Sequence, residues 1–318
     1  MQRGTDGEPA VVFLAAAAAQ FGRDLQLDLG RVESLVAAAR RAGASLLVLP
    51  DGTLGGHCTE ARDSGGLLRS QRYLARPETD CEPPDLPPAL AADDTIFDRV
   101  AATAGEMVVC LGYHERDGDR SYNAAVCLSG AGVHGRHRKV HLTPGERISY
   151  TPGDRFAAFD TPVGRVGMLI DYDKAFPEGA RSLADDGAVI LACLSAWPCT
   201  PADPGRSIAK DPQSRLFDLF DCARAAENQV VLVSANQTGR SGALTFIGNA
   251  KVVGPGGDIR ARTWTKAGLA VAELDPAVEV PMTRRVLHHL EERRPAAYRT
   301  EPGRSRKPPP PDAAVLES

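Results

Sequence analysis

Hydrophobic residues recur along the chain at two spacings, which predict strands and helices in turn. Residues 11–20 form an apolar run of strand length, and residues 28–41 carry apolar side chains at the spacing of a helix face. Residues 45–49 form a second apolar run, which ends in Pro50 and is followed by Asp51 and a glycine-rich loop. The chain thus begins as strand, helix, strand, and the second strand has a carboxylate at its carboxyl end.

The middle of the chain predicts strands that follow one another directly. After a helix over residues 94–105, strands are expected over 107–113, 122–128 and 132–140, and the first two are joined through the hairpin signal Asp117-Gly118. Because a tight turn joins antiparallel strands and a parallel pair needs a longer crossover, we expect a mixed sheet.

A third apolar run, over residues 166–170, ends abruptly at Asp171, and a helical pattern follows over 176–186. A side chain between a buried strand and a helix N-terminus lies where α/β proteins place their chemistry, because backbone N–H groups and the helix dipole converge there. We therefore expect the chemistry of this protein around Asp171.

The remainder alternates between strands and helices around glycine and proline turns. Strands are expected over 189–194, 230–235, 251–253, 258–263 and 270–273, and helices over 214–227 and 278–293. The pattern predicts one α/β domain of stacked layers over 11–298, with a polar tail (1–10) before it and a proline-rich arm (299–318) after it. The irregular segment 57–92, with a short helical pattern at 67–75, is expected to be either a lid over the site or a surface excursion.

Composition narrows the class of partner. The chain is 43% hydrophobic and 25% charged with a net charge of -4, which is typical of a globular protein without a basic footprint for nucleic acid or anionic lipid. The apolar run 11–19 is too short to span a bilayer and lacks the basic flank of a signal peptide, so we expect a cytoplasmic protein with a small-molecule substrate. The 7 scattered cysteines form no C-x-x-C pair, so they indicate reduced thiols and neither disulfides nor zinc, and no cofactor is indicated.

Short motifs lie along the chain in a set order. They are Leu47-Val-Leu-Pro-Asp51, Arg138-Lys-Val-His-Leu142 with Glu146 and Pro152-Gly-Asp154, the stretch 167–181, Arg224-Ala-Ala-Glu-Asn228, Asn236-Gln-Thr-Gly239 and Arg293-Arg-Pro-Ala-Ala-Tyr298. One motif alone would be weak. Together, in this order and spacing, they resemble the nitrilase, or carbon-nitrogen hydrolase, superfamily over nearly the whole chain.

The resemblance implies a four-layer α-β-β-α sandwich with mixed sheets. It also implies that two such sandwiches, one from each copy of the chain, pair in a homodimer or a larger homo-oligomer. It also implies a catalytic glutamate, lysine and cysteine with a second glutamate nearby. Carried over, Lys139 takes the lysine position, Glu146 the second glutamate, Asp51 the triad glutamate and Asp171 the cysteine. Asp51 keeps a carboxylate but is one methylene shorter, whereas Asp171 removes the thiol.

The loss of the thiol argues against the usual chemistry of the superfamily, because a carboxylate that attacks an amide forms an anhydride-like acyl enzyme from a poor nucleophile. Three carboxyl groups around one ammonium cannot all ionise without a large electrostatic cost in free energy, because like charges then lie close together. At least one of Asp51, Glu146 and Asp171 is therefore expected to have a strongly raised pKa and to be protonated near neutrality. A protonated carboxyl beside an ionised one is a general acid–base pair.

Three functional readings follow. We favour a repurposed enzyme in which Asp171 and Asp51 transfer protons while Lys139 stabilises a developing anion, on a small polar substrate that is amide-, nitrile- or amino-acid-like. The second is a catalytically inactive protein that keeps the fold for binding or regulation. The third is covalent catalysis by Asp171 on a carbon more electrophilic than an amide, or an engineered substitution in an ordinary enzyme.

The site residues also have structural interpretations. Asp171 could cap the helix that follows, with Lys139 as its buried partner. A metal held by the three carboxylates is a minor alternative, because Lys139 competes for the same charge. Tyr172, Cys193 and Trp197 are expected in the wall of the substrate pocket, and Cys193 equally fits a packed thiol of the core.

Two further groups of polar residues are expected to support the structure. His134, His137 and His141 resemble a ligand cluster but lie along one predicted strand and a motif, so structural roles are favoured over metal binding. A second group is expected to buttress the site from behind, and it consists of Arg224, Glu227 and Asn228.

Overall fold

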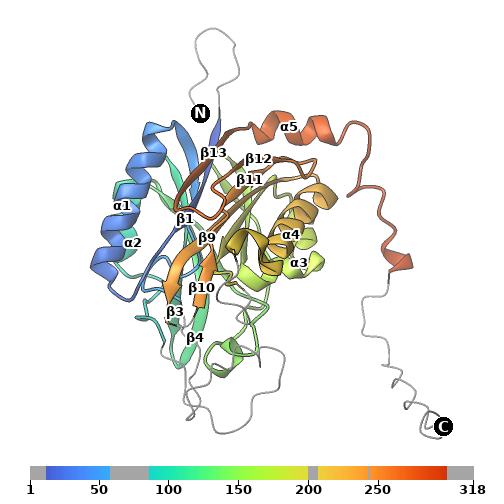
Figure 1. Ribbon diagram of the computed structural model, residues 1–318. Helices are drawn as coiled ribbons and strands as arrows, with labels where there is room; N and C mark the ends of the chain where they lie inside the picture. Colours follow the sequence, from blue (N-terminus) through green and yellow to red (C-terminus); the bar gives the residue numbers. More distant parts are fainter. Residues whose placement is uncertain (1–11, 58–85, 200–206, 243, 299–318) are drawn as a thin grey trace, which may run out of the picture.

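The computed structural model describes residues 12–57, 86–199, 207–242 and 244–298 (Figure 1). The tail 1–10, the helical pattern at 67–75 and the arm 299–318 lie outside the described residues. None of the described helices is long and apolar enough to cross a membrane.

Within these described ranges, the strands form one continuous 13-stranded sheet that folds over on itself. Its main path runs β5-β4-β3-β2-β1-β9-β8-β7-β6, and β1 joins the two halves by pairing in parallel with β9 as well as with β2. The bounds are β1 (Phe13–Ala19), β2 (Ala44–Val48), β3 (Val108–Asp117), β4 (Arg120–Ser129), β5 (Gly132–Arg138), β6 (Phe159–Thr161), β7 (Gly164–Ile170), β8 (Ile190–Ser195), β9 (Val231–Ser241), β10 (Leu244–Ile247), β11 (Lys251–Val253), β12 (Ile259–Arg262) and β13 (Gly268–Glu273). The predicted mixed sheet is confirmed, because β3, β4 and β5 pair antiparallel.

Helices cover both outer faces of the folded sheet. They are α1 (Leu25–Arg41), α2 (Ile96–Ala104), α3 (Pro177–Asp185), α4 (Pro212–Asn228) and α5 (Pro276–Thr283). Figure 1 shows α1 and α2 on one side of the strands and α3 and α4 on the other. One apolar core lies between the two halves of the sheet, a second under α1 and α2, and a third under α3 and α4. These layers are the predicted α-β-β-α arrangement.

The central strand β1 shows tertiary packing overriding local propensity. Its sequence FLAAAAA is rich in alanine, the best helix former, yet it pairs with β2, β9 and β13. Ala16 and Ala18 face the core between the two half-sheets, whereas Ala15 and Ala17 face the core under α1 and α2. Burial on both faces therefore selects a strand here.

The sheet brings the expected site residues to one edge. β2, β7, β8 and β9 run parallel through the pairing around β1, and β5 regains the direction of β3 after the antiparallel β4. Asp51 follows β2, Lys139 follows β5 and Asp171 follows β7. All three side chains thus come from carboxyl ends of strands that point the same way, where α/β folds place ligands.

Two predictions of secondary structure are wrong in extent. The helix predicted over 278–293 is present only as the shorter α5. Pro281 weakens a helix here because it has no N–H to donate. Beyond α5, Gln229 Nε2 donates to the carbonyls of Thr283 and Leu287, at 3.3 and 2.7 Å. The strand predicted over 230–235 continues to Ser241 and pairs with β10, which no sequence pattern indicated.

Gly112 offers a test of how closely β3 packs against the Asp51 turn. A Cβ at Gly112 would lie 2.8 Å from Asp51 Cα and 3.0 Å from the Pro50 carbonyl oxygen, both backbone atoms. We expect Gly112→Ala to lower the free energy of unfolding by about 1–3 kcal/mol in urea titrations, because the backbone of the site must shift. Gly30→Ala is the control: it lies exposed in α1 with open space around it, and should raise stability by about 0.5–1 kcal/mol. Equal effects at the two positions would contradict the close packing.

Candidate active site

The four residues singled out in the sequence meet in one buried cluster. Lys139 Nζ donates to Glu146 Oε1 and Oε2 at 2.7 and 2.8 Å and to Asp171 Oδ2 at 3.4 Å. Asn123 joins Asp51 to the cluster, since its Nδ2 lies 3.1 Å from Asp51 Oδ2 and 3.3 Å from Glu146 Oε1. All four predicted residues are at most 8% exposed. One ammonium thus lies among three carboxyl groups in a site largely shielded from solvent.

Glu146 is the most fully satisfied of these carboxylates. Besides Lys139, its Oε2 accepts hydrogen bonds from the backbone N–H and the hydroxyl of Thr143, at 2.8 and 2.9 Å. These contacts leave Glu146 little freedom to move. Its position suits a fixed counter-charge that orients the Lys139 ammonium.

Asp171 is presented on a strained turn. Its φ of 48° lies in the left-handed region that non-glycine residues seldom adopt, and such strain gathers at functional sites. Its Oδ1 accepts from the Ala196 N–H at 3.3 Å. The helix-cap interpretation is wrong, because the N-cap of α3 is Phe176 and no side chain of the described residues caps this helix. The Asp171 carboxyl group instead accepts hydrogen bonds from Lys139 and from the Ala196 N–H.

Asp173, two residues later, holds this turn against the end of β5. Its Oδ2 accepts from the Ile170 N–H at 3.1 Å and lies 3.0 Å from His137 Nε2, while its Oδ1 lies 3.0 Å from His141 Nδ1. Burial opposes ionisation of Asp173, but the hydrogen bonds from His137 and His141 outweigh it and hold the pKa of Asp173 far below its usual value. The structural role predicted for these histidines is confirmed. His134 contacts Ser129 Oγ instead, at 2.8 Å.

The surroundings of the cluster shift the pKa values of Asp171 and Asp51 in opposite directions. Burial raises the pKa of Asp171; Asp51 and Glu146 add to the rise, and Lys139 only partly offsets it. Burial also acts against ionised Asp51, yet His57, Lys139 and Asn123 reverse the sign and lower the pKa of Asp51. For Lys139, burial is outweighed by the carboxylates, which hold its pKa well above normal. The predicted rise is therefore found, in direction, at Asp171.

The sequence did not reveal two residues of the cluster, the bridging Asn123 and the titratable His57. His57 Nδ1 lies 3.5 Å from Asp51 Oδ2, its side chain is 11% exposed, and its ring makes an edge contact with Phe246. The sequence offered one signal for it, because a histidine directly follows the glycine-rich loop after Asp51. His57 is also the first residue of the irregular segment 57–92, so it was not assigned to the site. A second titratable base thus joins a cluster that was predicted to hold only Lys139 as its cation.

The three expected pocket residues have different surroundings. Trp197 follows Ala196, which holds Asp171, and its indole Nε1 donates to Gln213 Oε1 at 2.9 Å. Tyr172 is partly exposed on the Asp171 turn. Cys193 is not brought to the cluster: it is fully buried in the core under α3 and α4, where burial raises its pKa to about 12. Of its two interpretations, the packed core thiol is the one the structure supports.

The predicted buttress behind the Asp171 turn is confirmed. Arg224 in α4 donates from Nε to the Lys174 carbonyl at 2.9 Å and from its second terminal nitrogen to the Ala175 carbonyl at 3.1 Å. Glu227 accepts from Arg224 at 3.0 Å, and Asn228 donates to the Arg224 carbonyl at 2.9 Å. These bonds fix the backbone that carries Asp171 without touching its carboxyl group.

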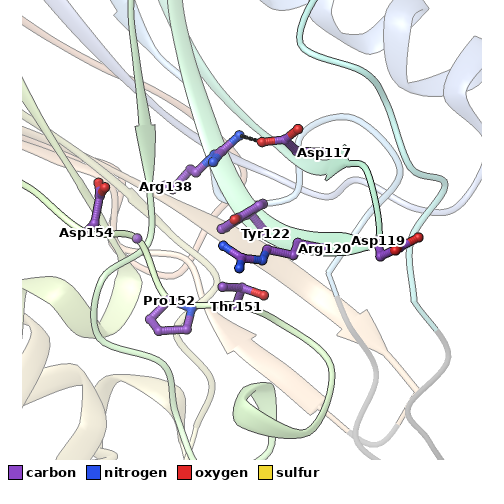
Figure 2. Close-up of a pocket in the computed structure, with 9 residues that line it drawn as sticks. Asp117, Asp119, Arg120, Tyr122, Arg138, Thr151, Pro152 and Asp154 are labelled. Carbon is purple, nitrogen blue, oxygen red and sulfur yellow. Dashed lines mark hydrogen bonds and ion pairs between the residues drawn. The ribbon is translucent and has the colours of Figure 1, made fainter.

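A separate cavity of about 460 Å³ opens beside the β3–β4 hairpin. Figure 2 shows the ion pair between Arg138 and Asp117 among the lining residues. Its N–O distance is 2.9 Å, and the Arg138 guanidinium lies 3.8 Å from the centre of the Tyr122 ring. The lining residues are Asp117, Asp119, Arg120, Tyr122, Arg138, Thr151, Pro152, Gly153 and Asp154. None of the four clustered residues lines this cavity, so it is distinct from the candidate active site.

The chain is similar in sequence to known hydrolases. A family model described as carbon-nitrogen hydrolase matches residues 14–282. The chain belongs to the carbon-nitrogen hydrolase family. It is 31% identical to a nitrilase of Pyrococcus abyssi over 78% of this chain and 83% of that relative. It is 27% identical to an N-carbamoylputrescine amidase of Solanum tuberosum over 82% of this chain and 86% of that relative.

Solved structures support the same fold. A carbon-nitrogen hydrolase from Helicobacter pylori superposes with a TM-score of 0.73 at 22% identity, covering 91% of this chain and 97% of that one. An amidase from Nesterenkonia superposes with a TM-score of 0.66 at 22% identity, covering 93% and 98%, and carries a covalent acetamide moiety on an active-site cysteine. At this identity the likeness establishes the nitrilase-type fold.

Proposed function

We propose that this member of the carbon-nitrogen hydrolase family hydrolyses a small polar amide- or nitrile-like substrate without a thiol nucleophile. In this proposal Asp171 stands where relatives have a cysteine and Asp51 where they have a glutamate. Asp51 and Asp171 transfer protons, and Lys139 stabilises the negative charge that develops on the substrate. Relatives named as nitrilase and N-carbamoylputrescine amidase support the substrate class.

The opposed pKa directions of Asp51 and Asp171 carry the proposal. Asp51 is favoured as the carboxylate and Asp171 is biased toward the acid form, within one buried cluster. Two titratable groups that the environment pushes in opposite directions are how a site assigns the base and the acid. Cys193 cannot substitute for the missing thiol, because it is fully buried in another layer.

A second candidate gives Asp171 a covalent role. The positive φ of Asp171 presents its carboxyl group on a sharp turn between a strand and a helix, as strained nucleophile turns do in other hydrolases. In that mechanism a carboxylate oxygen would bond to the substrate carbon, and water would then release the product. The same residue thus serves either as the acid or as the nucleophile, and isotope labelling separates the two roles.

Single-turnover hydrolysis in ¹⁸O-water tests the choice. The substrates are a panel of aliphatic amides, ω-amides, N-carbamoyl amines and nitriles. Direct attack by water, our expectation, places ¹⁸O in the acid product and leaves the Asp171 peptide with neither ¹⁸O nor an acyl adduct when the rapidly quenched reaction is analysed by mass spectrometry. An acyl adduct on Asp171, or ¹⁸O in its carboxyl group, would establish the covalent route. If the protein binds some of these compounds but hydrolyses none, the result favours the alternative of a catalytically inactive protein with a binding or regulatory role.

We also propose the assembly and location that the family likeness suggests: a homodimer or larger homo-oligomer in the cytoplasm, with no cofactor and no metal. Light scattering of the purified protein tests the assembly, and a monomer at micromolar concentration would contradict it.

A further inference from the structure

We propose that His57, paired with Asp51, is the base that takes a proton from the attacking water, so that an aspartate–histidine dyad works beside Lys139. This inference rests on the proposed hydrolytic function; it takes water as the nucleophile and moves the role of base from Asp51 to His57, with Asp51 as the carboxylate that orients the ring. It assigns a catalytic role to a residue that the resemblance did not provide.

Asp51 is held firmly at the end of β2. Its N–H donates to the Ser195 carbonyl at 3.3 Å, and its own carbonyl accepts from Gln237 Nε2 at 2.8 Å. Asn123 holds its Oδ2 at 3.1 Å. Backbone and side chain are therefore both fixed, which is what an orienting carboxylate requires.

The loop after Asp51 is built to carry His57 back toward it. Gly56 N–H donates to the Gly52 carbonyl at 3.1 Å, closing a tight turn. A Cβ at Gly52 would lie 2.6 Å from the carbonyl carbon of Gly56, and one at Gly56 would lie 2.8 Å from the Gly22 oxygen. Both glycines have positive φ, of 64° and 76°. No larger side chain fits, so the turn fixes the point at which His57 leaves it.

The ring of His57 faces the cluster through one nitrogen. Nδ1 lies 3.5 Å from Asp51 Oδ2, a separation that can shorten when substrate excludes water. A carboxylate opposite Nδ1 favours the tautomer with the proton on Nδ1, which leaves the Nε2 lone pair to accept a proton. Among the residues that the structure describes, none forms a hydrogen bond with Nε2.

The charged groups around His57 determine the pH range in which its ring is neutral and can accept a proton. Burial disfavours its cation, but Asp51, Glu146 and Asp171 outweigh burial and raise the pKa of His57 above 6.5. Among the described residues, Lys139 is the other cation of the cluster. The neutral ring is the base, so activity is lost as pH falls through this raised pKa. The protonated ring, in turn, is stabilised by Asp51 once the proton has arrived.

The proposed step conserves atoms and charge. Water gives a proton to Nε2 of neutral His57, and its oxygen forms a bond to the substrate carbonyl carbon. Lys139 stabilises the oxyanion. The C–N bond breaks as Asp171, in its acid form, gives its proton to the leaving nitrogen. The imidazolium then returns a proton to Asp171, and no reactant other than water is needed.

NMR of the histidine rings tests the dyad without any substrate. In the wild type, His57 should titrate above 6.5 and show the Nδ1–H tautomer in long-range ¹⁵N–¹H spectra. In Asp51→Asn the midpoint should fall by about one unit or more, because an opposite charge nearby shifts a pKa by about that amount. His134, which contacts Ser129 outside the cluster, should not move. A His57 resonance indifferent to Asp51, or the Nε2–H tautomer in the wild type, would overturn the dyad.

Activity tests the catalytic role. His57→Ala should lower kcat by about 10²–10⁴-fold with little change in KM, remove the acidic limb of the pH profile, and regain part of its rate with added imidazole. His134→Ala is the control and should keep wild-type kinetics. A retained acidic limb, or a loss confined to KM, would refute His57 as the base. A wild type that turns over none of the panel refutes the proposed hydrolysis instead, and the NMR result then decides the dyad by itself.

Discussion

Lys139→Met is expected to lower the free energy of unfolding by about 3–5 kcal/mol at pH 7, because removing one partner of a buried ion pair leaves uncompensated charge. Lys139 is 1% exposed and contacts both Glu146 and Asp171. Methionine keeps the shape of the side chain but has no donor, so Glu146 loses its two shortest hydrogen bonds from side chains. Urea titration followed by circular dichroism measures the loss.

The pH dependence identifies the cause of this loss. Without Lys139, the folded-state pKa of Asp171, which burial already raises, rises further above its unfolded value. The penalty is then full at neutral pH and shrinks as the carboxyl groups become protonated in acid. Adding Glu146→Gln should restore part of the stability. Lys266→Met, at an exposed lysine, is the control and should stay within about 0.5 kcal/mol of the wild type. A loss independent of pH would indicate disrupted packing.

Lys139→Met should also lower kcat/KM by about 10²–10³-fold on any substrate that the wild type hydrolyses, as loss of one oxyanion donor does in other hydrolases. Assays at low temperature, where the variant is still folded, separate this effect from unfolding. Wild-type rates in folded Lys139→Met would exclude Lys139 from the reaction.

Asp171→Asn is expected to move stability and activity in opposite directions. Asp171 has a raised folded-state pKa, so its ionisation works against folding at neutral pH, and a neutral amide of the same shape removes that cost. The melting temperature should rise. Activity should fall by about 10²–10⁴-fold, because the amide can neither donate the proton nor act as a nucleophile.

Asp173→Asn is the matched comparison in the same turn. Asp173 has a lowered folded-state pKa, so its stabilisation is present at neutral pH and is lost as pH falls below its usual 3.8. Its replacement should lower the melting temperature. Differential scanning calorimetry of the two variants at pH 7 measures the contrast. If both variants lose stability equally, Asp171 is an ordinary structural ion-pair partner of Lys139, as its structural interpretation holds.

The sequence by itself determined the family and most of the order of helices and strands. Apolar runs of strand length ending in a carboxylate predicted both Asp51 and Asp171 at strand ends, because local hydrophobic period and turn chemistry are written in adjacent residues. The ordered motifs carried the α-β-β-α expectation, and with it the positions of Lys139 and Glu146. Even the alanine run of β1 was predicted as a strand from its place in the pattern.

Other features were decided only by tertiary structure. The left-handed backbone of Asp171, its contact with Ala196 and the approach of His57 to Asp51 arise between segments far apart in the chain or within a tight glycine turn. The opposite pKa directions of Asp51 and Asp171 depend on which charges and how much burial surround each carboxyl group. Those distances are set when the half-sheets close, since Coulomb energy and desolvation depend on separation in space and not along the chain.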